Sequence, residues 1–122
     1  MMIWSALAAT LAVVVAVAHS IISERVILVP LFREAAGGVL QASAMRNITR
    51  ALFHMPSVAW AALGVGVVLN RIHGGPDLIA YVAMIVFISS AIGNLVALRR
   101  PHPGGLLLLL ATAATATDII VN

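Results

Sequence analysis

Two histidines, a glutamate and an arginine are the side chains whose types and spacing could do chemistry in this sequence. His19 and Glu24 lie near the end of the first apolar stretch, and Arg50 and His54 lie near the start of the second. In two neighbouring antiparallel helices these four side chains would reach a similar depth. Such a group can bind a polar or anionic ligand, ligate a haem iron through two imidazoles, or simply fix the packing of the helices.

The amino-acid composition is typical of a membrane protein. Of the 122 residues, 62 % are hydrophobic and only 9 % are charged, and the mean hydropathy is +1.11, whereas a soluble domain has roughly a quarter of its residues charged. A membrane-spanning helix needs about 20 predominantly apolar residues. We therefore expect an all-α membrane protein, one domain that folds as a four-transmembrane-helix bundle. The expected spans are residues 3–22, 48–70, 78–98 and 106–121.

The segment between the first two spans is more polar. It holds Arg25, Arg33 and Arg46, and Gly37-Gly38 divides it into two short amphipathic pieces. Pro30 is expected to end the first helix, because proline has no N–H to donate. We predict that this segment lies at the membrane interface.

The distribution of arginine predicts the orientation. Arginine is concentrated between spans one and two and between spans three and four, whereas the remaining connection has only Arg71. Because positively charged connections stay in the cytoplasm, we expect a multi-pass protein of a bacterial inner membrane with both termini periplasmic. The first span has no basic flank, so we expect it to be retained rather than cleaved as a signal peptide.

Small residues mark the packed side of the first span. Ala8, Ala12, Ala16 and Ser20 recur every four residues, a spacing that lets another helix approach closely in lipid. His19 borders this stripe and is expected to face protein. Its simplest role is that of a neutral ring hydrogen-bonded to Ser20, Ser23 or Asn94.

The second span extends the polar group. Arg46, Arg50 and His54 follow one another at intervals of four residues and should share one side of the helix. Pro56 is expected to kink or open the helix beside His54. The full set of candidate ligand-binding residues is His19, Ser20, Ser23, Glu24, Arg25, Arg46, Arg50, His54 and Asn94.

The amino-acid sequence leaves three functions open. The first is binding or transport of a small polar or anionic ligand at the cytoplasmic end of the bundle. The second is electron transfer by haem b, with His19 and His54 as axial ligands. The third is a non-catalytic accessory or structural subunit, working as a homo-oligomer, with a dimer favoured, or within a larger membrane complex. Nucleic acid is not an expected partner, because the arginines stand at helix ends without interleaved aromatic residues.

An enzyme is the least favoured interpretation. Arg50-Ala51 is similar to the Arg-Ala pair that opens the second span of four-helix membrane enzymes acting on glutathione and eicosanoids. In those enzymes an asparagine follows three residues after the alanine, where this chain has His54, and the acidic residue that comes next is absent here. The similarity therefore transfers no catalytic roles.

The first half of the chain more closely resembles a group of short, uncharacterised bacterial four-span proteins. Their pattern is carried here by His19-Ser20, Glu24-Arg25, Pro30-Leu31, Arg50 and Phe53-His54. This chain has Ile22-Ser23 where that group often has Leu-Gly. The resemblance implies a four-helix bundle and no known activity.

Overall fold

The computed structural model describes residues 2–34 and 37–122, and the regular structure in these residues is helical. The elements are α1 (Ile3–Ile22), the π-helix η1 (Ser23–Leu28), α2 (Val29–Glu34), the 3-10 turn η2 (Val39–Gln41), α3 (Ser43–Ile72), α4 (Leu78–Leu98) and α5 (Pro103–Val121). Four helical stretches of the described chain are long and apolar enough to cross a membrane. The predicted helical class and the predicted number of potential spans are confirmed.

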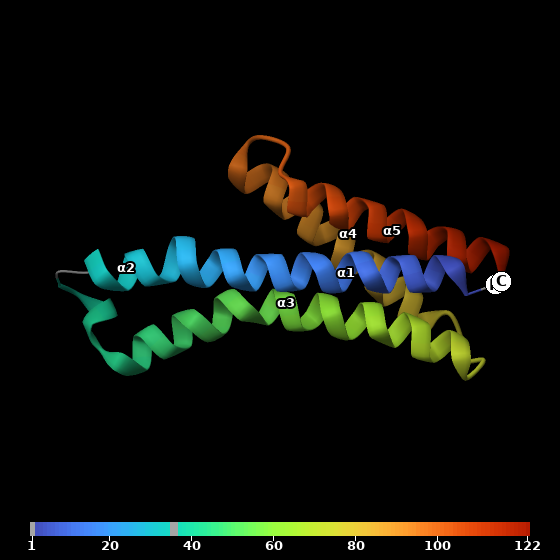
Figure 1. The fold of residues 1–122 in the computed structure, drawn as a ribbon, viewed down its shortest axis with the longest axis horizontal. Helices are drawn as coiled ribbons and strands as arrows, with labels where there is room; N and C mark the ends of the chain where they lie inside the picture. Colours follow the sequence, from blue (N-terminus) through green and yellow to red (C-terminus); the bar gives the residue numbers. More distant parts are fainter. Residues whose placement is uncertain (1, 35–36) are drawn as a thin grey trace.

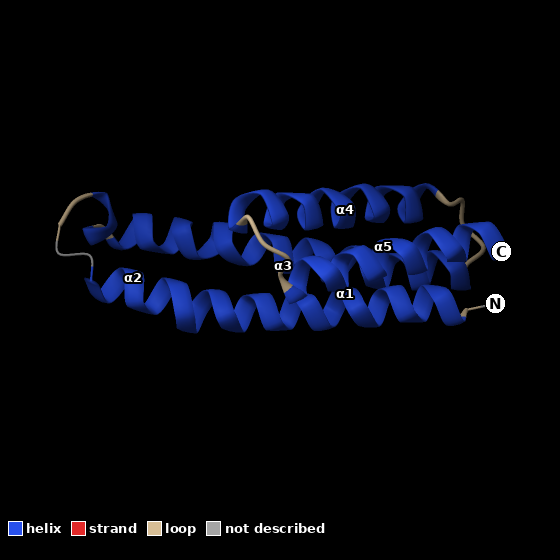
Figure 2. Cartoon of the chain, turned by 90° about the horizontal axis from the view of Figure 1, so that it is seen from above, coloured by secondary structure: helices blue, strands red, loops and turns tan. Residues whose placement is uncertain are grey.

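The four long helices pack as a bundle in which each contacts two of the others. α1 packs against α3 on one side and α5 on the other, while α4 contacts α5 and, less extensively, α3 (Figures 1 and 2). Because an even number of helices is joined by short connections, α1 begins and α5 ends at the same end of the bundle. We call this the termini end and the opposite end the hairpin end.

The helices differ in length. The continuous helix from Ile3 to Glu34 has 32 residues and α3 has 30, which corresponds to about 45 Å each at 1.5 Å per residue. The 21 residues of α4 and 19 of α5 give only about 30 Å, close to the thickness of a bilayer's hydrocarbon core. The hairpin of α1–α2 and α3 therefore extends well beyond the α4–α5 connection (Figure 1).

The expectation that Pro30 ends the first helix is wrong. Proline cannot donate to the carbonyl four residues earlier, and its ring would clash with that carbonyl, which belongs to Val26. The helix widens into η1 just before Pro30, where the N–H of Val29 donates to the carbonyl of Glu24, five residues earlier. A π-turn thus accommodates the proline, and the helix continues to Glu34.

Most of the predicted interfacial segment consequently belongs to the two long helices. α3 begins at Ser43, five residues before the expected start of the second span, and it remains helical through Pro56. Figure 1 shows the axis of α3 bending along its length, so that its outer part diverges from α1. The bend accords with the kink expected from Pro56.

The stripe of small residues is largely buried in the bundle, and Ala12 carries its close contact with α3. Ala8, Ala12 and Ala16 are buried. A Cβ added to Gly64 of α3 would lie 2.8 Å from Cβ of Ala12 and 3.1 Å from Cα of Ala9, so only glycine allows this approach. Gly66 faces α4 instead, where an added Cβ would lie 3.4 Å from Cγ2 of Ile79.

A buried carboxylate holds the termini end together. Asp118 of α5 is fully buried and accepts a hydrogen bond from the backbone N–H of Ser5 in α1 at 3.1 Å. Arg71, at the end of α3, donates from Nε to the same carboxylate at 2.9 Å and also pairs with Asp77 at 3.1 Å. Three helices therefore meet at one acidic side chain, which the sequence analysis did not single out.

Candidate functional site

Glu24 links α1 to α3 where the long hairpin emerges from the bundle. Its carboxylate accepts bonds from Nε and Nη2 of Arg50, the shortest of which is 2.8 Å. The second oxygen of Glu24 also lies 3.2 Å from Nε2 of His54. Arg50 stacks over the ring of Phe32 at 5.3 Å. The widened turn of η1 carries Glu24, so the feature that accommodates Pro30 also sets the position of this carboxylate.

Two histidine–serine hydrogen bonds cross between the same helices in opposite directions. His19 of α1 bonds through Nδ1 to the hydroxyl of Ser57 in α3 at 3.0 Å, and His54 of α3 bonds through Nδ1 to the hydroxyl of Ser20 in α1, also at 3.0 Å. Each helix thus supplies one imidazole and one hydroxyl. We call this arrangement the His–Ser clasp. Hydrogen bonds of this kind join helices in the apolar interior of a membrane.

The structure gathers some of the predicted site residues and leaves others apart. Ser20, His54, Glu24 and Arg50 form one hydrogen-bonded chain, and His19, next to Ser20 on α1, bonds separately to Ser57. The partner of His19 is Ser57, which was not among the three expected partners.

Four predicted site residues lie outside this network. In the described chain neither Arg25 nor Arg46 has an ion pair or a side-chain hydrogen bond. Ser23 is buried on α1–η1. Asn94 bonds to the backbone carbonyl of Ser90 within α4.

A cavity of about 190 Å³ lies beside the His–Ser clasp, between α1, α3 and the start of α5. We call it the His19 cavity. Its lining residues are Val15, Ala18, His19, Ile22, Trp60, Asn94, His102, Pro103, Gly104 and Leu107. None of them is an arginine, lysine, aspartate or glutamate, so the cavity is polar at a few points but carries no fixed charge.

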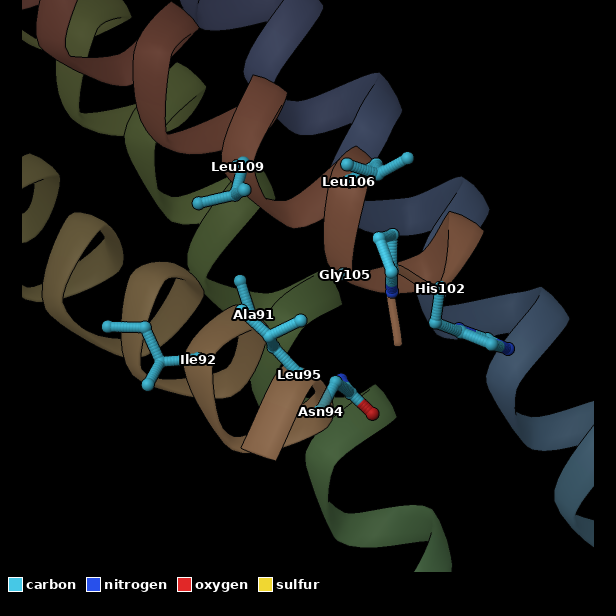
Figure 3. Close-up of a pocket in the computed structure, with 9 residues that line it drawn as sticks. Ala91, Ile92, Asn94, Leu95, His102, Gly105, Leu106 and Leu109 are labelled. Atoms are coloured by element: carbon cyan, nitrogen blue, oxygen red, sulfur yellow. The ribbon is translucent and has the colours of Figure 1, made fainter. Parts of the chain in front are cut away.

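The polar wall of this cavity is shared with two neighbouring hollows. His19, Trp60 and Asn94 also line an open depression on the α3–α4 side, together with Pro56, Ser90 and Gly93. Asn94 and His102 border a third, apolar pocket between α4 and α5. Figure 3 shows the ring of His102 extending from this pocket toward α1, away from Ile92 and Leu109.

Packing orders the side chains of the polar wall. The rings of His19 and Trp60 meet edge to face, with centroids 5.0 Å apart and an angle of 77°. The indole N–H of Trp60 donates to the hydroxyl of Ser90 at 3.0 Å. His19 and Trp60 are therefore held from two sides, by Ser57 and by Ser90, before any ligand arrives.

Three polar atoms of this wall keep free hydrogen-bonding capacity. Nε2 of His19, Oδ1 of Asn94 and Nε2 of His102 bond to no other atom of the described residues. The described chain has no buried side-chain nitrogen or oxygen without a partner, so these three atoms must be accessible from a cavity or a surface. Nδ1 of His102 accepts the N–H of Gly104 at 3.2 Å, and the neutral ring therefore carries its proton on Nε2 as a donor.

Four residues of the site were missed or undervalued in the sequence. Ser57 and Trp60 follow His54 at intervals of three residues, so they share a face of α3, and this spacing was a usable signal. Ser90 of α4 and His102 were not among the candidate residues, although His102 caps α5 and lines the His19 cavity.

The arrangement does not fit a haem held by two histidines. An axial histidine needs one ring nitrogen free for the iron, but both nitrogens of His54 are engaged, by Ser20 and by Glu24. The His19 cavity also excludes His54 from its lining. Within residues 2–34 and 37–122, no three His, Cys, Asp or Glu side chains are grouped in a way that could hold a metal ion.

Comparison of the chain with protein-family models, with curated protein sequences and with solved structures finds no match to any of them. The function must therefore be argued from the geometry of the chain itself.

Proposed function

We propose that this chain is a four-span membrane protein that binds a small, neutral, hydrogen-bonding ligand in the His19 cavity. One observation carries the proposal: three unpaired polar atoms, on His19, Asn94 and His102, border one uncharged cavity. Sites for small ligands typically combine an apolar lining with a few fixed polar groups. The preordered wall of His19 and Trp60 lowers the entropic cost of binding.

Of the polar or anionic ligands expected from the sequence, the cavity favours a neutral polar one. Arg25, Arg46 and Arg50 do not line it. The guanidinium of Arg50 is already occupied by Glu24. To bind Arg50, an anion would have to displace the carboxylate of Glu24, whereas a neutral ligand in the cavity leaves this ion pair unchanged.

The membrane placement belongs to the same proposal. The α4–α5 pair spans the hydrocarbon core, and the outer part of the α1–α3 hairpin lies at the interface on the cytoplasmic side, with both termini periplasmic. Exposed apolar residues such as Val26 and Ile48 alternate there with arginines, which is the composition of a segment between headgroups and acyl chains. Assembly as a dimer or within a larger complex stays a prediction.

Phenol and benzene, two rings that differ by one hydroxyl, test the binding function. An apolar cavity of about 150 Å³ accepts benzene, so the probes are phenol and benzene, added to the protein in detergent during thermal unfolding. We expect phenol to raise the midpoint temperature with concentration, as ligands of the native state do, and benzene to raise it less.

Two matched variants locate the effect. Ala18 is exposed at the edge of the cavity, and Ala6 is exposed on the same helix, distant from it. Ala18→Phe places a ring at the cavity and should abolish the response to phenol, while Ala6→Phe should retain it. Equal responses in the wild type and in both variants would show that phenol acts through the detergent and would overturn the proposal.

A further inference from the structure

We infer that the ligand of the His19 cavity is the ring of a lipid-soluble quinone, a ring bearing carbonyl oxygens and an apolar tail. This inference rests on the proposed function and narrows it to one chemical class. It is carried by the size of the cavity, the position of its mouth and the kind of hydrogen-bonding groups it offers.

The volume of the His19 cavity matches a ligand with a single six-membered ring. The His19 cavity has a volume of about 190 Å³, against about 150 Å³ for a cavity that holds benzene. A benzoquinone ring with its two oxygens matches this space. A whole lipid or a multi-ring cofactor would leave most of its atoms outside.

The mouth of the cavity faces the lipid. Ala18 and Ile22 are exposed on α1, and both line the cavity. In the proposed membrane placement this level is the edge of the hydrocarbon core, where exposed apolar side chains border acyl chains. The ligand therefore enters from the membrane, and it must be soluble there.

A path for an apolar tail leads from this mouth toward the middle of the bundle. Val14 precedes Ala18 by one helical turn, and Leu110 follows Leu107 by three residues on α5. Val14 and Leu110 are 50 % and 57 % exposed. α1 and α5 lie side by side (Figures 1 and 2), so a tail leaving the cavity can lie along their shared outer surface.

The polar wall suits carbonyl oxygens. Nε2 of His102 is a donor because Nδ1 accepts from Gly104. Asn94 uses one of its two amide hydrogens on the carbonyl of Ser90 and keeps the other. Nε2 of His19 is a further group with no partner in the described chain, and it donates when its ring holds the proton there. Uncharged donors beside an apolar lining are what a neutral carbonyl acceptor requires.

Fluorescence of Trp60 provides a direct test. The chain has two tryptophans, Trp4 at the termini end and Trp60 in the cavity wall. In a Trp4→Phe variant in lipid nanodiscs, decyl-benzoquinone should quench Trp60 in a saturable way. In a Trp60→Phe variant, quenching of Trp4 should rise linearly with quinone and without saturation, because only collisions in the bilayer cause it.

Competition and variants complete the experiment. Decylbenzene has the ring and the tail without the oxygens, and we expect it to displace the quinone at least tenfold less well. His102→Leu in the Trp4→Phe background should raise the half-saturating quinone fraction about tenfold, and Ala18→Phe should remove the saturable component. Ala6→Phe should leave it unchanged.

The possible results separate this inference from the function it rests on. If phenol stabilises the protein but decyl-benzoquinone neither quenches Trp60 saturably nor reduces the phenol effect, the quinone class is wrong and cavity binding stands. If decylbenzene competes as well as the quinone, the oxygens are not recognised and the class is again wrong. If phenol, benzene and quinone all fail, both proposals fall.

Discussion

The two ends of the bundle each carry an acidic side chain that joins helices, but the two networks differ in burial. Asp118 at the termini end has a fully buried side chain, and its partner Arg71 is 18 % exposed. Glu24 at the hairpin end is 33 % exposed, and its partners Arg50 and His54 are 42 % and 30 % exposed. The same chemistry, a carboxylate shared by several donors, thus occurs in a sealed and in an open setting.

The difference in burial separates a structural role at Asp118 from the ligand-binding role that we propose beside Glu24. Around Asp118, the backbone of Ser5, the guanidinium of Arg71 and the amide of Asn122 occupy the carboxylate, and no described cavity includes it. At the other end, the His–Ser clasp beside Glu24 adjoins the His19 cavity, where polar atoms are still unpaired. Within the described residues, the unpaired polar atoms on which the proposed binding rests lie toward the hairpin end.

The largest expected effect comes from removing the sealed carboxylate. Asp118→Ala leaves Arg71 with the more exposed carboxylate of Asp77 and the backbone carbonyl of residue 118, and it leaves the N–H of Ser5 without an acceptor. Breaking one side of a buried ion pair typically costs about 3–5 kcal/mol. We expect the free energy of unfolding in detergent, followed by circular dichroism, to fall by about this amount.

Asp77→Ala is the matched control, because it removes the second carboxylate of the same arginine. Its side chain is 38 % exposed, and it makes no capping hydrogen bond at the start of α4, so a much smaller loss is expected. Equal losses in the two variants would mean that Asp118 is not sealed, and the contrast between the two ends would disappear.

The sequence predicted the termini end less well than it should have. An ionisable residue within a span is unusual enough to suggest a role by itself, and Asp118 was passed over among the threonines of the last helix. Its partner Arg71 is 47 positions away in sequence. However, both residues stand at the same end of antiparallel helices, and opposite charges at one end could have been paired.

The hairpin end shows what the sequence could and could not supply. Helical spacing predicted a common depth for His19, Glu24, Arg50 and His54, and in the structure Glu24 bonds to Arg50 and His54 across the two helices. The partners of His19 depend on the rotation of α3, which Gly64 fixes by its close contact with Ala12. No pattern within α1 alone could reveal that rotation or the His19 cavity that results from it.

An intermediate effect is expected from the His–Ser clasp. His54→Ala and Ser20→Ala, made singly and together, form a double-mutant cycle for the 3.0 Å bond between them. Hydrogen bonds between membrane helices are worth about 0.6 kcal/mol on average and up to about 1.7. We expect a coupling energy within this range, measured by unfolding in detergent.

A second cycle on His19 and Ser57 serves as the comparison, since its bond has the same length. The two coupling energies should agree to within about 0.5 kcal/mol, the usual limit of additivity. A coupling near zero in both cycles would show that the clasp does not hold α1 to α3, and the hairpin end would then lack a structural element of its own.

The smallest effect on stability is expected at the open carboxylate. Glu24→Gln removes the charge but keeps an oxygen that can accept from Arg50. Because both partners are substantially exposed, solvent screens their attraction. The drop in midpoint temperature should be smaller than that of His54→Ala, and the difference from the wild type should shrink as salt is added.

Glu34→Gln is the control, at an exposed glutamate without an ion pair in the described chain. It should change the midpoint temperature least of all. If Glu24→Gln instead destabilised the protein as much as Asp118→Ala at every salt concentration, Glu24 and its partners Arg50 and His54 would have to be covered in the membrane. The covering element would then be a second copy of the chain or another subunit, because within the described residues Glu24 keeps a third of its side-chain surface exposed.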